Sequence, residues 1–107
     1  MRLLIVEDEK ELCDTIAKTL YQAGYEVDTC YDGDEALDYI LAEDYDLIVL
    51  DLNLPGTDGM DILKELRKEN EETKVLILSA RSQIVDKVEG LDAGANEYME
   101  KHFQLQE

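Results

Sequence analysis

The chain has 107 residues and a formal net charge of −17, because acidic residues outnumber basic ones by 27 to 10. Such a surface disfavours direct binding to nucleic acid or to anionic membranes, and it suits a cation or a basic partner. An apolar content of 45% with clear periodicity argues against disorder. We therefore expect one folded domain over residues 1–107.

Two further features bear on the cellular compartment. No apolar run approaches the roughly 18 residues of a membrane span, and the apolar run 3–6 is too short for a signal peptide. Cys13 and Cys30 lack the spacing of metal ligands, and we interpret them as reduced, half-buried packing residues. These features predict a cytoplasmic protein.

Short apolar runs alternate with helical patterns along the chain. We expect strands at 3–6, 25–30, 46–50, 74–78 and 95–99. Each helix between them is marked by apolar residues at helical spacing. The first carries Leu12, Cys13, Ile16, Ala17 and Leu20, and the second, over about 33–42, has Ala36, Leu37, Ile40 and Leu41 facing inward. The third carries Ile62, Leu63 and Leu66, and the fourth, over about 82–93, carries Ile84, Val85, Val88 and Leu91. Gly24 and Gly94 are expected to end the first and fourth helices.

This alternation predicts an α/β fold with a parallel sheet that helices cover on both faces. Burial on both faces explains why the strands at 3–6, 46–50 and 74–78 are apolar almost throughout. In such sheets, ligands bind beyond the carboxyl ends of the strands. The residues directly after each strand are therefore the candidates for a functional site.

Polar side chains follow four of the five predicted strands: Glu7 and Asp8, then Asp51, Ser79 and Lys101. Clustered carboxylates raise each other's pKa unless a cation lies between them, and oxygen ligands of this kind suit Mg²⁺. Lys101 and Ser79 would then contact phosphoryl oxygens. In that arrangement Asp51 can act as a carboxylate nucleophile that forms an acyl phosphate.

Each of these residues also has a simpler structural interpretation. The acids at 7–9 could cap the first helix, and Ser79 could cap the fourth. Asp51 could satisfy backbone donors in the following turn, and Lys101 could be an ordinary surface residue. The convergence of all of them on one edge of the sheet favours a shared site.

Four segments resemble the receiver domain of two-component response regulators: LLIVEDE (3–9), LIVLDLNLPGTDG (47–59), VLILSA (75–80) and ANEYMEKHF (95–103). They occur in the family's order and spacing and span nearly the whole chain. Residues 80–103 further resemble the OmpR/PhoB-like subfamily, whose output is a winged-helix DNA-binding domain. The resemblance implies a doubly wound, flavodoxin-like sheet of five strands in the order 2-1-3-4-5.

The resemblance also implies roles for individual residues. Asp51 would accept a phosphoryl group from a sensor histidine kinase. The cofactor Mg²⁺ would be held by Asp8, by Asp51 and by the backbone carbonyl of Asn53, with Glu7 acting mostly through water. A phosphorylated Asp51 would then control an output domain that is absent from this chain.

Further residues match the positions that read the phosphoryl group in this family. Lys101 and Ser79 would hold its oxygens. Tyr98 matches the switch aromatic, which turns inward as the Ser79 loop closes; the alternative is a half-buried strand aromatic with no such role. Asn53 and Arg81 match positions that tune the lifetime of the acyl phosphate.

The sequence departs from the family pattern near its end. Lys101 is followed by His102, where the family has a proline, usually after a cis bond. Without proline the cis form costs about 2.5–4 kcal/mol, so we expect a trans bond and a Lys101 that points away from Asp51. The family favours Asp-Asp-Tyr-Leu where this chain has residues 96–99 as Asn-Glu-Tyr-Met. Phe103 and Leu105 resemble the start of a fifth helix that is cut short.

We therefore expect a receiver domain that is truncated or engineered and lacks the final helix. An uncovered apolar patch invites association, so we predict a homo-oligomer or an exchanged-element dimer. The family's dimer face combines the fourth helix, the fifth strand and the fifth helix. Its remaining residues would be Lys87, Val88, Leu91, Asp92 and Glu97.

Three other functions compete with a phosphoacceptor module. An aspartyl-phosphate hydrolase of the haloacid-dehalogenase type needs Asp-x-Asp, and residues 51–53 read Asp-Leu-Asn. A dinucleotide-binding domain needs Gly-x-Gly-x-x-Gly after the first strand, which is absent. A receiver-fold scaffold that no longer switches stays open, because of the shortened end and the histidine after Lys101.

Overall fold

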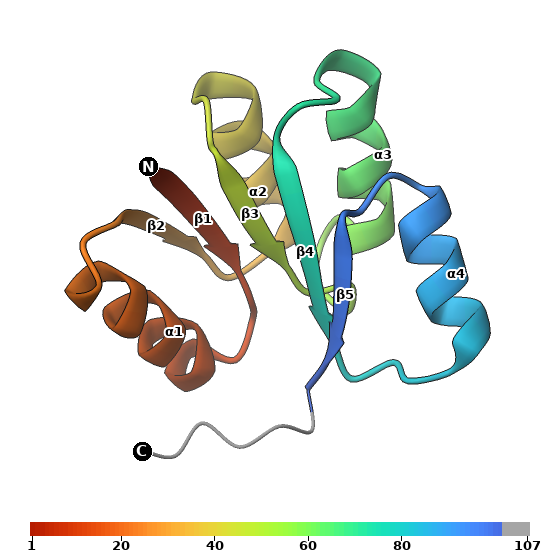
Figure 1. Cartoon of the computed structure of the whole chain (residues 1–107), viewed down its shortest axis with the longest axis horizontal. Coiled ribbons are helices and arrows are strands. Elements are labelled where there is room, and N and C mark those ends of the chain that lie inside the picture. The colour runs from red at the N-terminus through yellow and green to blue at the C-terminus, as the bar shows by residue number, and fades with distance from the viewer. Residues whose placement is uncertain (102–107) are drawn as a thin grey trace.

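Strands and helices alternate strictly along residues 1–101, the part of the chain that the computed structural model describes (Figure 1). The elements are β1 (Arg2–Val6), α1 (Lys10–Gln22), β2 (Glu26–Cys30), α2 (Gly33–Ala42), β3 (Leu47–Leu50), α3 (Gly59–Glu69), β4 (Lys74–Ser79), α4 (Ile84–Asp92) and β5 (Glu97–Glu100). The predicted alternation is confirmed. The fourth helix begins two residues later than expected, and the fifth strand is shifted toward Lys101.

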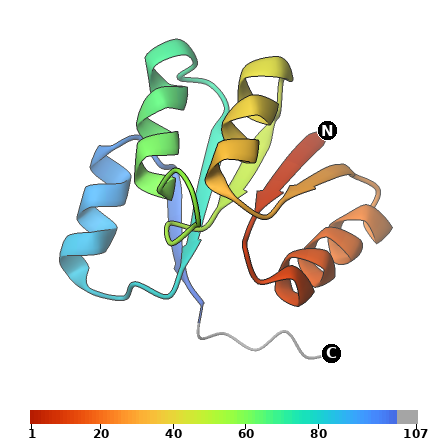
Figure 2. The ribbon, with the colours of Figure 1, turned by 180° about the vertical axis from the view of Figure 1, so that it is seen from behind.

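The strands form one parallel sheet in the order β2-β1-β3-β4-β5, as the resemblance implied. Val6 is in register with Leu50 and Leu50 with Ile77, so β1, β3 and β4 reach the same edge of the sheet. Helix α1 lies on one face of the sheet, and α2 and α3 lie on the other (Figures 1 and 2). The doubly wound prediction is therefore confirmed.

Successive residues of a strand pack alternately into two separate hydrophobic layers, one on each face of the sheet. Leu4 and Val6 pack with residues of α2 and α3, whereas Ile5 packs with Cys13 of α1. Because each face of the sheet is covered, neighbouring residues of β1 are buried although their side chains point in opposite directions. The buried strands hold the residues that follow them in fixed positions at the carboxyl edge.

Two glycines end helices as predicted. Gly24 and Gly94 have φ angles of 105° and 116°, the left-handed conformation that glycine adopts without a steric penalty. Side-chain caps mark two helix starts: Asp32 accepts a hydrogen bond from Glu35 N, and Asp58 from Met60 N. These caps fix the N-termini of α2 and α3 beside the carboxyl edge of the sheet.

The cysteine prediction was correct on redox state and wrong on burial. Cys13 and Cys30 are free, but both are fully buried rather than half-buried, because each lies inside one of the two hydrophobic layers. Burial raises the pKa of each thiol to about 12. Both are therefore neutral packing groups with little thiolate character.

One prediction about inward-facing residues also needs correction. Leu41 is exposed, because the buried stripe of α2 follows Gly33, Ala36 and Ile40, and Leu41 lies one residue beyond it. The four apolar residues that marked the fourth helix, Ile84, Val85, Val88 and Leu91, are also exposed. Helix α4 instead docks through Gly90, whose missing side chain lets the helix approach Ile77 and Tyr98 closely.

Among residues 1–101, none of the helices combines the length and apolar character that a membrane crossing requires.

Candidate functional site

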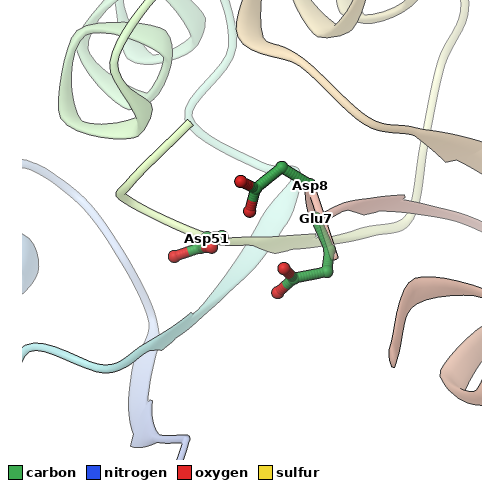
Figure 3. Close-up of side chains that lie close together, drawn as sticks. All are labelled: Glu7, Asp8 and Asp51. Atoms are coloured by element: carbon green, nitrogen blue, oxygen red, sulfur yellow. The ribbon is translucent and has the colours of Figure 1, made fainter. Parts of the chain in front are cut away.

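Three carboxylates meet at the carboxyl edge of the sheet (Figure 3). Glu7 and Asp8 follow β1 and Asp51 follows β3, and Asp51 N donates a hydrogen bond to Val6 O at 3.0 Å. One carboxylate oxygen from each of the three lies within 4.8 Å of the other two. Glu7 is 1% and Asp51 3% exposed, whereas Asp8 is open to solvent. The cluster predicted from the strand ends is therefore present.

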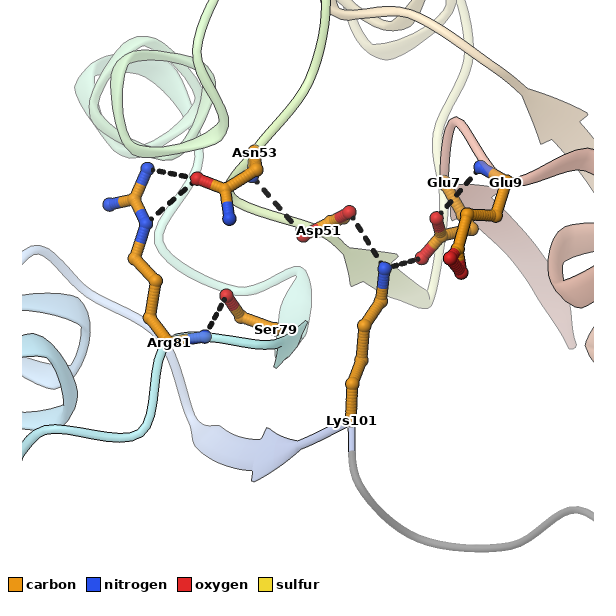
Figure 4. A network of polar contacts seen from close by, with 7 residues as sticks. All are labelled: Glu7, Glu9, Asp51, Asn53, Ser79, Arg81 and Lys101. Carbon is orange, nitrogen blue, oxygen red and sulfur yellow. Dashed lines mark hydrogen bonds and ion pairs between the residues drawn. The ribbon is translucent and has the colours of Figure 1, made fainter.

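Lys101 reaches into this cluster from the end of β5 (Figure 4). Its Nζ lies 2.7 Å from Glu7 Oε1 and 3.0 Å from Asp51 Oδ2. The prediction that Lys101 points away from Asp51 was wrong. Its backbone N donates to Ser79 O at 2.9 Å, so the pairing of β5 with β4 fixes the residue whatever follows it. The 101–102 peptide bond and the start of the expected fifth helix lie outside the described residues.

One ammonium does not fully compensate the two buried acids. Burial raises the pKa of both Glu7 and Asp51, although Lys101 lowers each. For Lys101, burial lowers the pKa, but the pairs with Glu7 and Asp51 outweigh it and raise the pKa above its ordinary value. The site therefore keeps an excess of desolvated negative charge, which favours binding of a further cation.

The oxygen atoms of the cluster suit a hard divalent cation. Glu7 Oε2 accepts a hydrogen bond from Glu9 N at 2.9 Å, but Glu7 Oε1 is buried and has no aligned donor, despite the nearby Lys101 ammonium. A buried carboxylate oxygen without a donor is costly unless a cation or water meets it. Glu7, Asp8 and Asp51 together offer the carboxylates that Mg²⁺ prefers, with Asp8 on the solvent side for retained waters.

The turn after Asp51 is held by Arg81 (Figure 4). Asp51 Oδ1 accepts a hydrogen bond from Asn53 N at 3.1 Å. Asn53 Oδ1 in turn accepts two hydrogen bonds from the Arg81 guanidinium, at 2.9 and 2.6 Å, and Arg81 also reaches Asp58 Oδ1 at 3.3 Å. Asn53 and Arg81, predicted separately as tuning residues, therefore contact each other.

Arg81 also joins Ser79 to Tyr98 through its backbone. Ser79 Oγ accepts from Arg81 N at 3.1 Å, so its buried hydroxyl still has a proton to donate. The half-buried Tyr98 donates its hydroxyl to Arg81 O at 2.8 Å. The loop that carries Arg81 thus contacts the acid site on one side and the predicted switch aromatic on the other.

The capping interpretation is wrong for Ser79 and holds only in part for the acids at 7–9. Helix α4 has Gln83 rather than Ser79 at its N-cap, and no side chain makes a capping hydrogen bond there. Glu9 is the N-cap of α1, again without a side-chain cap. Glu7 bonds the backbone of Glu9 but directs its other oxygen toward Lys101 and Asp51.

Sequence reasoning missed the contacts that position the loop after Asp51. A Cβ on Gly59 would lie 2.3 Å from Asp51 O, so only glycine permits this approach of α3. Asp34 at the start of α2 accepts hydrogen bonds from Thr57 Oγ1 at 2.6 Å and from Thr57 N at 3.2 Å. The Asp-Gly pair at 58–59 was the available signal for the first contact, and no local pattern indicated the second.

The predicted dimer face is largely open to solvent. Val88 and Leu91 are 50% and 46% exposed, and Asp92 and Glu97 are also exposed. Lys87 is intermediate, because its Nζ pairs with Glu100 at 2.9 Å. Association through this face stays a prediction.

The comparisons with known proteins agree with this geometry. The family model of the response regulator receiver domain matches residues 3–107. The chain belongs to this family. The transcriptional regulatory protein DltR of Streptococcus agalactiae is 48% identical over the whole chain, which covers 48% of DltR. The receiver domain thus spans about half the length of such relatives, and their role as transcriptional regulators agrees with the OmpR/PhoB-like prediction.

Solved structures of other response regulators are similar to this chain over nearly its whole length. The receiver domain of Francisella response regulator 1452 has a TM-score of 0.90 at 38% identity, covering 96% of this chain and 85% of that one. The Thermotoga maritima regulator TrrA, solved with Mg²⁺ and beryllofluoride, has a TM-score of 0.85 at 33% identity, covering 98% and 90%. Receiver domains are phosphoacceptors in two-component signalling, and they take phosphoryl groups from histidine kinases.

Proposed function

We propose that Asp51 of this receiver domain accepts the phosphoryl group of a partner histidine kinase, with Mg²⁺ bound by Glu7, Asp8 and Asp51. The observation that carries the proposal is the contact of Lys101 Nζ with both Glu7 Oε1 and Asp51 Oδ2 in a buried acid cluster. Such a cluster pairs a carboxylate nucleophile with a fixed positive charge.

The transfer can be written with the residues of this site. A carboxylate oxygen of Asp51 forms a bond to phosphorus as the bond from phosphorus to the histidine nitrogen breaks, and its electron pair stays on that nitrogen. Lys101 and the hydroxyl of Ser79 would then hold phosphoryl oxygens. Bound Mg²⁺ supplies charge neutralisation at the phosphoryl oxygens. The backbone carbonyl of Asn53 is its proposed further ligand.

The site gives less support to one competing function and requires an experiment for the other. A phosphatase of the Asp-x-Asp type needs an acid at position 53, where the amide oxygen of Asn53 is instead bonded to Arg81. A receiver-fold scaffold that keeps its pocket residues but no longer switches shares the contact of Lys101 with Asp51, so an Asp51-dependent response to a phosphoryl mimic is what separates it from the proposed function. Transfer of the signal to an output domain outside this chain, and self-association through the α4–β5 face, remain parts of the proposal without a direct structural contact.

Beryllofluoride, a stable mimic of a phosphoryl group, tests the proposal. With Mg²⁺ present it should raise the thermal unfolding temperature of the wild-type chain in a saturable way, because bound ligand stabilises the folded state. The Asp51→Asn variant should show no such rise, and Asp61→Asn, a change on the exposed side of α3, should respond like wild type. Equal responses in wild type and Asp51→Asn would refute the proposal.

A further inference from the structure

We propose that the cavity between the C-terminal ends of α2 and α3 binds a small aliphatic diamine. This cavity has a volume of about 180 Å³ and lies at the amino edge of the sheet, where the loops before β3 and β4 run side by side (Figures 1 and 2). Asp51 lies beyond the opposite end of β3, so this site is separate from the phosphoacceptor site.

The floor of the cavity is apolar and rigid. Ile40, Ile48, Leu66 and Tyr45 line it, and each is 9% exposed or less. The position of Tyr45 is also fixed by a hydrogen bond, because its hydroxyl donates to Asp28 Oδ2 at 2.6 Å. Pockets for drug-sized ligands measure about 300–1,000 Å³, so this smaller cavity suits a short aliphatic chain.

The rim of the cavity carries negative charge that basic residues only partly neutralise. Four carboxylates line it and no lysine or arginine does. Glu43 pairs with Arg2 at 2.6 Å and Glu65 with Lys68 at 2.9 Å. Within residues 1–101, the other two, Asp44 and Glu69, form no ion pair. Two unpaired negative charges over an apolar floor are complementary to a dication with an apolar middle.

The helix ends add to the negative potential of the rim. Helix α2 ends at Ala42 and α3 at Glu69, and the C-terminus of a helix carries a partial negative charge. No basic residue lies in the last turn of α2. The last turn of α3, in contrast, holds two basic residues: Arg67, which bonds Gly94 O and Asn70 O, and Lys68, which pairs with Glu65. A bound ammonium group would therefore meet carbonyl as well as carboxylate oxygens at the end of α2.

A hydroxyl without a hydrogen-bond partner, on a residue that is mostly buried, is the second observation that favours a ligand. Thr73 lines the cavity and is 7% exposed, yet its hydroxyl makes no hydrogen bond within the described residues. The loop around it is fixed, because Asn70 Oδ1 accepts from Glu72 N at 2.7 Å and from Thr73 N at 3.0 Å. The hydroxyl oxygen can therefore accept a hydrogen bond from an ammonium group without rearrangement of the loop.

A titration followed by two-dimensional amide NMR tests this site. We expect 1,4-diaminobutane, added at constant ionic strength, to cause saturable shifts that cluster at residues 40–45 and 65–73. Butylamine, which has one charge, should bind about tenfold more weakly, as should 1,4-diaminobutane to the double variant Asp44→Asn, Glu69→Gln. Thr73→Val should also weaken binding, whereas Glu72→Gln, an exposed acid outside the cavity, should not.

The diamine site should be independent of the phosphoacceptor site, and the same NMR titration tests this. Asp51→Asn should leave the titration unchanged, so failure of one proposal does not affect the other. Shifts that do not saturate, shifts centred on Glu7, Asp8 and Asp51, or an unchanged affinity in the double variant would each overturn the diamine site. The spectrum of each variant before titration establishes that it is folded.

Discussion

Replacing Lys101 by methionine is expected to lower the free energy of unfolding by about 3 kcal/mol at pH 8 without Mg²⁺. Methionine keeps most of the packing but removes the ammonium that contacts the buried Glu7 and Asp51 carboxylates. Two buried acids are then left without their cation. Urea unfolding of both proteins in a chelating buffer measures the difference.

The effect of Lys101→Met should depend on pH in a defined direction. Lys101 lowers the pKa of both acids, so its loss raises each folded pKa further above the ordinary values of 4.5 for Glu7 and 3.8 for Asp51. A carboxyl with a raised folded pKa contributes stability that is fully present below its unfolded pKa and is lost as pH rises through the folded one. The deficit should therefore be small near pH 4 and full at pH 8.

Lys87→Met is the matched control for this change. Lys87 also pairs with an acid at 2.9 Å, but its side chain is 39% exposed, so the variant should lose no more than about 1 kcal/mol. Saturating Mg²⁺ should restore part of the stability of Lys101→Met and leave Lys87→Met unchanged. Equal losses in the two variants at pH 8 would contradict the described charge balance.

Replacing Gly59 by alanine should damage both stability and phosphorylation. A Cβ at this position would lie 2.3 Å from Asp51 O and 2.6 Å from Leu52 Cα, which are backbone atoms that no rotamer change can move. We expect the overpacking to cost about 2–3 kcal/mol. The clash should displace Asp51 by up to about 1 Å and thereby slow its phosphorylation by acetyl phosphate roughly 100-fold. Intact-mass spectrometry measures this rate.

Gly90→Ala is the control that shows whether the slower phosphorylation is specific to Gly59 or follows from replacing any closely packed helix glycine by alanine. Its Cβ would meet side-chain atoms, Ile77 Cδ1 at 2.8 Å and Tyr98 Cδ2 at 3.2 Å, and these side chains can give way. The variant should phosphorylate at a rate within a few fold of wild type. A Gly59→Ala protein that is phosphorylated as fast as Gly90→Ala would show that α3 does not position Asp51.

The sheet and most of the acid site could be predicted because they depend on periodicity and chain direction. Continuous apolar runs required burial on both faces, and parallel strands had to end at one edge. Asp51, Glu7 and Asp8 therefore had to meet whatever the details of packing. The strand order came from the family resemblance rather than from the pattern.

Features that depend on long-range pairing were predicted less well. The missing proline after Lys101 suggested a displaced side chain, but the pairing of β5 with β4 places it beside Asp51. Helix α4 has an apolar stripe that is exposed, because its contact with the sheet is made by Gly90. The contact of Arg81 with Asn53 and Asp58 joins the loop after β4 to the loop between β3 and α3, and no local pattern encodes it.

The most direct test of the central claim is to locate the phosphoryl group on the chain. After incubation with acetyl phosphate and Mg²⁺, borohydride reduction converts a phosphorylated aspartate to homoserine, which peptide mass spectrometry assigns to a position. The account predicts homoserine at position 51 alone, and none when Mg²⁺ is removed by a chelator. Homoserine at Asp8 or Asp58 instead, or none at position 51 with Mg²⁺ present, would contradict it.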